Sequence, residues 1–206
     1  MISVILLSIV GGIVYLIWMI VTAFKKRWKK LGYQFASAVV YVGLLYVAGV
    51  LHDRYEEAQY FRGVFAVSGT LPTPTFSYDS ERAFNGDGYS IQVFALPKSV
   101  RERFESFDEK ALGALPQKPD YRSQWKTSPW RKTPMQSSEN KYLDFALSNF
   151  GPAEVRYHQK AIRELVGKTG SYVAYFYFDH GDYPGNIDLF VVDLEGNRLY
   201  LINFNT

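Results

Sequence analysis

The chain has 206 residues, with 23 basic and 20 acidic residues and no cysteine. The lack of cysteine excludes disulfide bonds and thiol chemistry within these residues. Five of the basic residues fall in the short segment 25–30, and the remaining 18 do not outnumber the 20 acidic residues. The basic balance therefore indicates membrane topology and gives no indication of nucleic-acid binding.

The first 51 residues predict a transmembrane hairpin of two helices. Ile2–Phe24 carries no charge, and a bilayer core of about 30 Å needs roughly 20 helical residues. Tyr33–Leu51 has about the minimum length for a second span. The positive-inside rule places the basic segment 25–30 in the cytoplasm. The N-terminus and everything from His52 onward are then expected outside the bacterial inner (cytoplasmic) membrane, in the periplasm or at the cell exterior.

A cleaved signal peptide is the alternative for the first apolar run. The run lacks a basic segment before it, and cleavage near Val21-Thr22-Ala23 would leave five positive charges directly after the cleavage site. Such charges disfavour translocation, so the uncleaved hairpin is the preferred interpretation.

One extracytoplasmic domain, residues 61–206, is predicted after a polar segment. Residues 52–60 continue the second helix or form a short stalk. Phe61–Ser68 and Tyr89–Leu96 are expected to be strands, and the second of these alternates clearly between apolar and polar residues. Pro97 opens a helix in which Ser99 and Glu102 have the spacing of a capping box.

The second half of the domain predicts an extended loop, two helices and three strands. Residues 114–136 contain four prolines and are expected to form the loop. The first of the two helices is expected to run from Ser137 or Ser138 to the helix-breaking pair Gly151-Pro152. The second is expected to run from Ala153 to Val166, before Gly167. The predicted closing strands are Tyr172–Phe178, Ile187–Asp193 and Arg198–Phe204, separated by the loop Asp179–Asn186 and the turn Glu195–Asn197. Short connections indicate an antiparallel meander, so the fold class is α+β: an antiparallel sheet with about three helices on one face and the last strand inside the sheet.

The segment 76–89 contains a first group of candidate binding residues. Asp79, Glu81, Arg82 and Asp87 can form a polar binding rim just before a strand. The sequence 85–88, Asn-Gly-Asp-Gly, is equally explained by turn geometry, because Gly and Asn tolerate positive φ.

The predicted loop 114–136 combines basic and aromatic residues. Arg122, Trp125, Trp130 and Arg131 are candidates for contact with a protein partner, since Arg, Trp and Tyr are favoured interface anchors. The same residue types would also rest on anionic lipid headgroups. The alternative is a loop whose tryptophans pack back on the domain.

The predicted hairpin loop 179–186 carries residues of metal-ligand type: Asp179, His180 and Asp182, followed by Tyr183. The spacing fits neither an EF-hand nor a zinc site, so a partner contact or a solvated tip is expected in place of a metal. His158 falls on the apolar side of its helix and is expected to be a packed core histidine.

No catalytic signature occurs in the chain. The motifs of serine hydrolases, zinc proteases and nucleotide-binding loops are absent. Carboxylate pairs for glycoside hydrolysis stay open, because the fold sets their spacing. No cofactor is expected.

Two segments resemble small uncharacterised bacterial membrane-anchored envelope proteins. The matching residues are the turn Gly86-Asp87-Gly88 and the closing segments Asn186–Asp193 and Asn197–Thr206, in which Asn205 stands where the pattern has an acid. The resemblance implies an envelope location and brings no activity with it.

These observations favour a membrane-anchored extracytoplasmic binding domain without catalysis. Its most concrete form is an immunity protein that neutralises a bacterial toxin, with the lipid bilayer and a protein as partners. A non-catalytic subunit of a cell-envelope complex is the first alternative, and an envelope hydrolase is the second.

Overall fold

The computed structural model describes residues 2–84, 86–106, 112–135, 140–148 and 151–206. The chain divides into two compact units, residues 1–55 and residues 56–206. Each unit is considered by itself.

The first unit contains helix α1 (Ile2–Phe24) and most of helix α2 (Trp28–Phe65). The two helices touch through polar groups: the Tyr15 hydroxyl donates to the Gln34 carbonyl at 2.7 Å and also contacts the Ser37 hydroxyl. Among the residues described with side chains, α2 is the one helix long and apolar enough to cross a membrane, whereas the apolar part of α1, Gly11–Phe24, is shorter. The first unit therefore holds one candidate membrane span.

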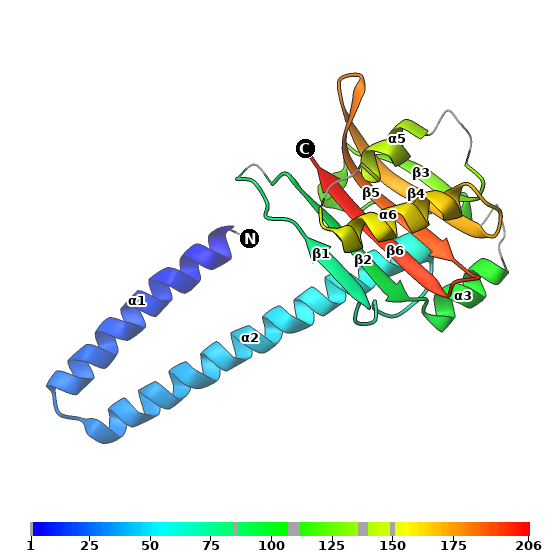
Figure 1. The fold of residues 1–206 in the computed structure, drawn as a ribbon. Coiled ribbons are helices and arrows are strands. Elements are labelled where there is room, and N and C mark those ends of the chain that lie inside the picture. Colours follow the sequence, from blue (N-terminus) through cyan, green and yellow to red (C-terminus); the bar gives the residue numbers. More distant parts are fainter. Residues whose placement is uncertain (1, 85, 107–111, 136–139, 149–150) are drawn as a thin grey trace. The chain divides into compact units, whose positions relative to one another are not determined.

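The second unit is built on a six-stranded antiparallel sheet (Figure 1). Its strands are β1 (Phe76–Asp79), β2 (Gly88–Ala95), β3 (Lys126–Lys132), β4 (Ser171–His180), β5 (Tyr183–Asp193) and β6 (Arg198–Asn205). The order across the sheet is β1-β2-β6-β5-β4-β3, so the last strand lies inside the sheet between β2 and β5, as predicted. The predicted α+β class and the closing antiparallel meander are confirmed.

The predicted loop 179–186 is mostly strand. β4 and β5 continue to the pair His180–Tyr183, which leaves a two-residue turn with Gly181 at a φ of +64°. The backbone ladder continues past the apolar part of each strand, because hydrogen-bond pairing does not require apolar side chains. Polar residues together with Gly181, Pro184 and Gly185 predicted a loop, but these residues do not exclude a hairpin of paired strands.

The described helices of the second unit are α3 (Lys98–Glu105), α5 (Asn140–Ala146), α6 (Ala153–Val166) and the end of α2, with a 3₁₀ turn, η1 (Asp120–Arg122). α6 has the predicted bounds. The capping box predicted for α3 does not form: Pro97 is the N-cap, and Ser99 lies inside the helix. The predicted helix start at Ser137 or Ser138 falls outside the described residues.

The prediction of a strand at Phe61–Ser68 is wrong, because α2 continues to Phe65. Phe61, Val64 and Phe65 have the i, i+3, i+4 spacing of one helix face, and all three are buried in the domain core. Residues 52–60 therefore continue the helix, which was one of the two alternatives for this segment.

Helices cover both faces of the sheet, so the expectation of helices on one face is wrong. α5 and α6 lie over one face, and the end of α2 with α3 packs on the other (Figure 1). The face under α5 and α6 is apolar along most of the central strands, with rows such as Ile91–Ile202–Leu189, and it ends in the row Ala95–Arg198–Asp193.

The predicted loop 114–136 contains the edge strand β3. Pro129 lies in an irregularity between Ser128 and Arg131, where a residue without an N–H is tolerated. The Trp130 backbone N–H donates to the Leu115 carbonyl at 3.0 Å, so the segment around Leu115 covers part of this sheet edge. The four prolines of this segment predicted a loop, because proline is rare in strands. An edge strand, however, can contain a proline, as β3 does at Pro129.

The packing between α3 and the sheet predicts a large difference between two phenylalanines. Phe104 is 0 % exposed and contacts Trp130 and Tyr172 edge-on, whereas Phe84 is fully exposed. We expect Phe104→Ala to lower the free energy of unfolding by about 3–5 kcal/mol and Phe84→Ala to lower it by less than about 0.5 kcal/mol. Denaturant unfolding of the full chain in detergent measures both changes, and equal losses would contradict this account of the core.

Candidate binding site at one end of the sheet

Residues from separate parts of the sequence meet at one end of the sheet. β2 begins there at Gly88, β6 ends at Asn205, and β4 and β5 meet at the His180–Tyr183 turn. The 3₁₀ turn η1 reaches this end because Arg122 pairs with Asp188 of β5. Three of the segments singled out in the sequence therefore contribute to one place.

Two adjoining cavities, of about 380 and 560 Å³, open at this end and share Arg122 and Asn205. The first cavity is lined by Tyr60, Leu71, Arg82, Ser90, Gln92, Arg122, Asp188, Phe190, Leu201, Ile202, Asn203 and Asn205. The second is lined by Gly86, Asp87, Tyr121, Arg122, Trp125, His180, Asn186, Asn205 and Thr206. Together they are called the end groove below.

The floor of the end groove is a polar stretch of an otherwise apolar sheet face. Paired residues on neighbouring strands share a face, so β2, β6 and β5 present their side chains in rows. The rows change along the strands from Gly88–Asn205–Asn186 and Ser90–Asn203–Asp188 to Gln92–Leu201–Phe190 and Phe94–Leu199–Val192. The apolar rows lie under α2 and α3, and the polar rows form the groove.

A buried ion pair lies at the centre of the end groove. The Arg122 guanidinium pairs with the Asp188 carboxylate, and their side chains are 16 % and 5 % exposed. The Asn203 side-chain amide donates to the other Asp188 oxygen at 2.5 Å. Arg82 donates to the Asn203 side-chain oxygen at 3.3 Å and contacts Asp79 at 3.4 Å. Asp188 is therefore satisfied on both oxygens by groups from two other elements.

Aromatic rings form the side of the end groove at η1. The Arg122 guanidinium carbon lies 4.1 Å from the centroid of the Trp125 ring and 5.5 Å from that of Tyr121. Burial lowers the pKa of Arg122, while Tyr60 and Tyr121 act in the opposite direction. Burial raises the pKa of the Tyr60 hydroxyl, so Tyr60 stays protonated and can donate a hydrogen bond.

Asp179 belongs to a second polar cluster, which involves α5 and lies outside the groove. It accepts hydrogen bonds from the Lys126 ammonium at 2.9 Å and from the Tyr142 hydroxyl at 3.0 Å. Burial acts to raise the pKa of Asp179, but these two hydrogen bonds outweigh it and the pKa is lowered. Asp179 is therefore an ionised structural acid, and a general acid would need a raised pKa.

The other candidate residues fall into two groups. Asp79, Glu81, Arg82, Asp87, His180, Asp182 and Tyr183 all lie at this end of the sheet, and Arg82, Asp87 and His180 line the groove. Trp130 and Arg131 do not line the groove. Trp130 is 3 % exposed, and its indole N–H donates to the Val64 carbonyl at 2.8 Å, so a partner has no access to it. Arg131 donates to the Ser128 hydroxyl at 2.8 Å.

Sequence reasoning missed the strand residues of the groove. Asn186 and Asp188 in β5, and Asn203 and Asn205 in β6, are polar residues at alternate positions, which places them on one face of a strand. That alternation was the available signal. Tyr60 carried no signal, because it reaches the groove from the end of α2.

The described residues contain no group of three or more His, Cys, Asp or Glu side chains arranged to hold a metal ion. His158 is half-buried and stacks on Phe76 with ring centroids 4.4 Å apart, as a packed histidine does. Burial lowers the pKa of His158, and Arg198 adds to this effect.

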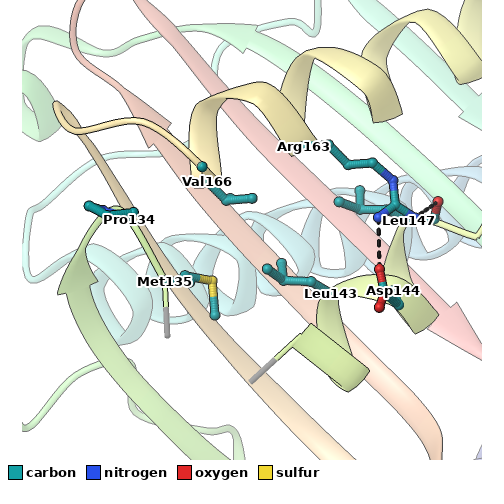
Figure 2. Close-up of a pocket in the computed structure, with 8 residues that line it drawn as sticks. Pro134, Met135, Leu143, Asp144, Leu147, Arg163 and Val166 are labelled. Carbon is teal, nitrogen blue, oxygen red and sulfur yellow. Dashed lines mark hydrogen bonds and ion pairs between the residues drawn. The ribbon is translucent and has the colours of Figure 1, made fainter. Parts of the chain in front are cut away.

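A further cavity of about 350 Å³ lies on the opposite face of the sheet, among residues of the α5–α6 core (Figure 2). Met135, Leu143, Leu147 and Val166 give it an apolar wall, and Arg163 closes one side through an ion pair with Asp144 at 2.8 Å (Figure 2). The two charged residues of its lining, Arg163 and Asp144, neutralise each other.

Comparisons of the chain with protein-family models, with curated proteins and with solved structures found no match. The end groove and the apolar N-terminal helices therefore carry the functional inference.

Substitutions at the two residues of the buried ion pair should have non-additive effects on the free energy of unfolding. We expect Arg122→Met to lower the free energy of unfolding by about 3 kcal/mol, because the Asp188 carboxylate is left buried without its cation. The double variant Arg122→Met, Asp188→Leu should regain most of this loss, since neither charge then remains buried. Denaturant unfolding of both variants tests the pair, and additive losses would contradict it.

Proposed function

We propose that this protein is a membrane-anchored binding domain of the bacterial inner membrane. Residues 1–51 cross the bilayer twice, and residues 61–206 recognise a partner on the extracytoplasmic side. The uncharged α1 sequence, the length and apolar character of α2 and the basic segment 25–30 support this topology.

The end groove is the observation that carries the proposal. It is a cavity of mixed polar and aromatic lining at the meeting point of several segments, which is the usual character of a binding site. A buried ion pair contributes little net stability, so its presence in an open groove favours recognition over packing.

The chemistry of the groove favours binding over catalysis. Asp188, the carboxylate at the centre of the groove, pairs with Arg122 on one oxygen and accepts a hydrogen bond from Asn203 on the other. A carboxylate with both oxygens engaged in this way has no free oxygen for proton transfer. This argument counts against the hydrolase alternative.

The concrete form that we propose is an immunity protein that neutralises a bacterial toxin at the outer face of the membrane. Three large aromatic side chains, Phe84, Tyr121 and Tyr183, are exposed around the end groove. Exposed aromatics at the rim of a cavity are suitable anchors for a protein partner.

A subunit of an envelope complex is the second candidate, and one observation favours it. A Cβ atom built on Gly11, Gly12, Gly43 or Gly49 would meet no atom within 4 Å, so these positions leave room for a helix of another chain. Small residues permit close helix contact in membranes.

The proposed topology predicts the reactivity of single cysteines, which the cysteine-free chain makes easy to measure. Glu195→Cys and Asp182→Cys should react with a membrane-impermeant maleimide in spheroplasts, whereas Lys29→Cys should react only after permeabilisation. The opposite pattern would place the domain in the cytoplasm and end the proposal.

The proposed immunity role predicts that a toxin copurifies with the full chain and that cells lacking the protein are killed by toxin-armed siblings. Tyr183→Ala should weaken toxin binding about tenfold or more. The control is Tyr157→Ala, another exposed tyrosine, which lies on α6 on the other face and should leave binding unchanged.

Replacement of residues 1–51 by an unrelated two-span anchor separates the two candidates. Full protection of cells after the exchange supports the immunity role, and loss of function with a folded domain supports the complex subunit. Normal survival of the deletion strain among toxin-armed siblings would rule out the immunity role.

A further inference from the structure

We infer that the end groove binds a neutral saccharide. This goes beyond the proposed function, which requires a partner at this end of the sheet without stating the chemistry that the groove itself accepts. Four properties of the groove lead to this ligand class: its charge balance, its hydrogen-bonding groups, its aromatic wall and the strands that form its floor.

The charged groups of the groove balance one another. Two arginines, Arg82 and Arg122, and two aspartates, Asp87 and Asp188, line it. Arg122 is already paired with Asp188, and Arg82 contacts Asp79 and Asn203. An anionic ligand would have to compete with these carboxylates, so the groove favours a ligand without net charge.

The uncharged polar groups of the groove match hydroxyl groups. Ser90, Gln92, Asn186, Asn203 and Asn205 line the two cavities. Amide and hydroxyl side chains both donate and accept hydrogen bonds, as sugar hydroxyls do. An anion only accepts and an ammonium group only donates, so each would leave part of this lining without a partner.

Aromatic rings stand beside these polar groups. Tyr121 is exposed and Trp125 is half-buried, and both line the larger cavity. Tyr60 lines the smaller one, with a hydroxyl that stays protonated. A sugar ring has apolar C–H faces and polar edges, so it can lie against a ring while its hydroxyls meet the amides.

The floor of the groove disfavours an extended peptide. β2, β6 and β5 are interior strands whose backbone groups are paired in the sheet. A peptide that binds by strand addition needs a sheet edge, whereas this floor can be recognised only through side chains. The cavities, of about 380 and 560 Å³, fall in the range of small-ligand sites, roughly 300–1,000 Å³.

Saturation-transfer difference NMR on the full chain in detergent micelles tests the inference. The probes are di-N-acetylchitobiose and maltotriose as neutral saccharides, glucuronate as an anionic sugar and Ala-Gln as a neutral dipeptide. We expect a neutral saccharide to bind with signals on its ring protons, and glucuronate and the dipeptide to bind at least tenfold more weakly. A preference for chitobiose would identify amino-sugar polymers of the cell wall as the source of the ligand.

Two groove variants and two matched controls locate the site. Trp125→Ala should weaken saccharide binding about tenfold or more, whereas Trp28→Ala, an exposed tryptophan of the first unit, should not. Gln92→Ala should weaken it about three- to tenfold through lost hydrogen bonds, whereas Gln117→Ala, an exposed glutamine outside the groove, should not.

Four results would overturn the inference: no saturation by either neutral saccharide, tighter binding of glucuronate, tighter binding of the dipeptide, or equal losses in the groove and control variants. Circular dichroism confirms that each variant is folded. Toxin copurification is measured separately, so failure of the saccharide site and failure of the proposed immunity role are distinguishable.

Discussion

The ion pair between Arg122 and Asp188 is the interaction on which the candidate site depends. It joins a 3₁₀ turn, whose sequence belongs to a proline-rich connection, to a central strand of the sheet. A buried carboxylate without a cation is strongly unfavourable, so the pair holds η1 over the polar rows of the sheet. Trp125 and Tyr121 take their places beside the groove because Arg122 is held there.

The sheet face that carries the groove is divided between two tasks. Its apolar rows are covered by α3 and by the last residues of α2, where Phe61 and Phe65 pack against Trp130 and Phe190. Its polar rows are left to the groove. The opposite face is mostly apolar and is covered by α5 and α6. The two tasks meet at Phe190, which lines the groove and is also part of the core.

The groove recognises through side chains that are themselves held in place. Asn203 is fixed between Asp188 and Arg82, and Arg122 is fixed between Asp188 and Trp125. Side chains ordered before binding lose less conformational entropy when a ligand arrives. The exposed aromatics Phe84, Tyr121 and Tyr183 add accessible contact area.

Local patterns in the sequence determined the α+β class, α6, β2, the closing meander and the apolar N-terminal helices, because hydrophobic periodicity and strong breakers act over a few residues. They also indicated Arg82, Asp87, Arg122, Trp125 and His180 as site residues. Only the tertiary structure decided that Phe61–Phe65 is helix, that β3 is an edge strand, and that helices cover both faces, because these depend on what packs against each segment. It also decided which polar residues share a groove: strand pairing brings Asp188 and Asn203 together, and the ion pair with Asp188 adds Arg122, which is far from both in sequence.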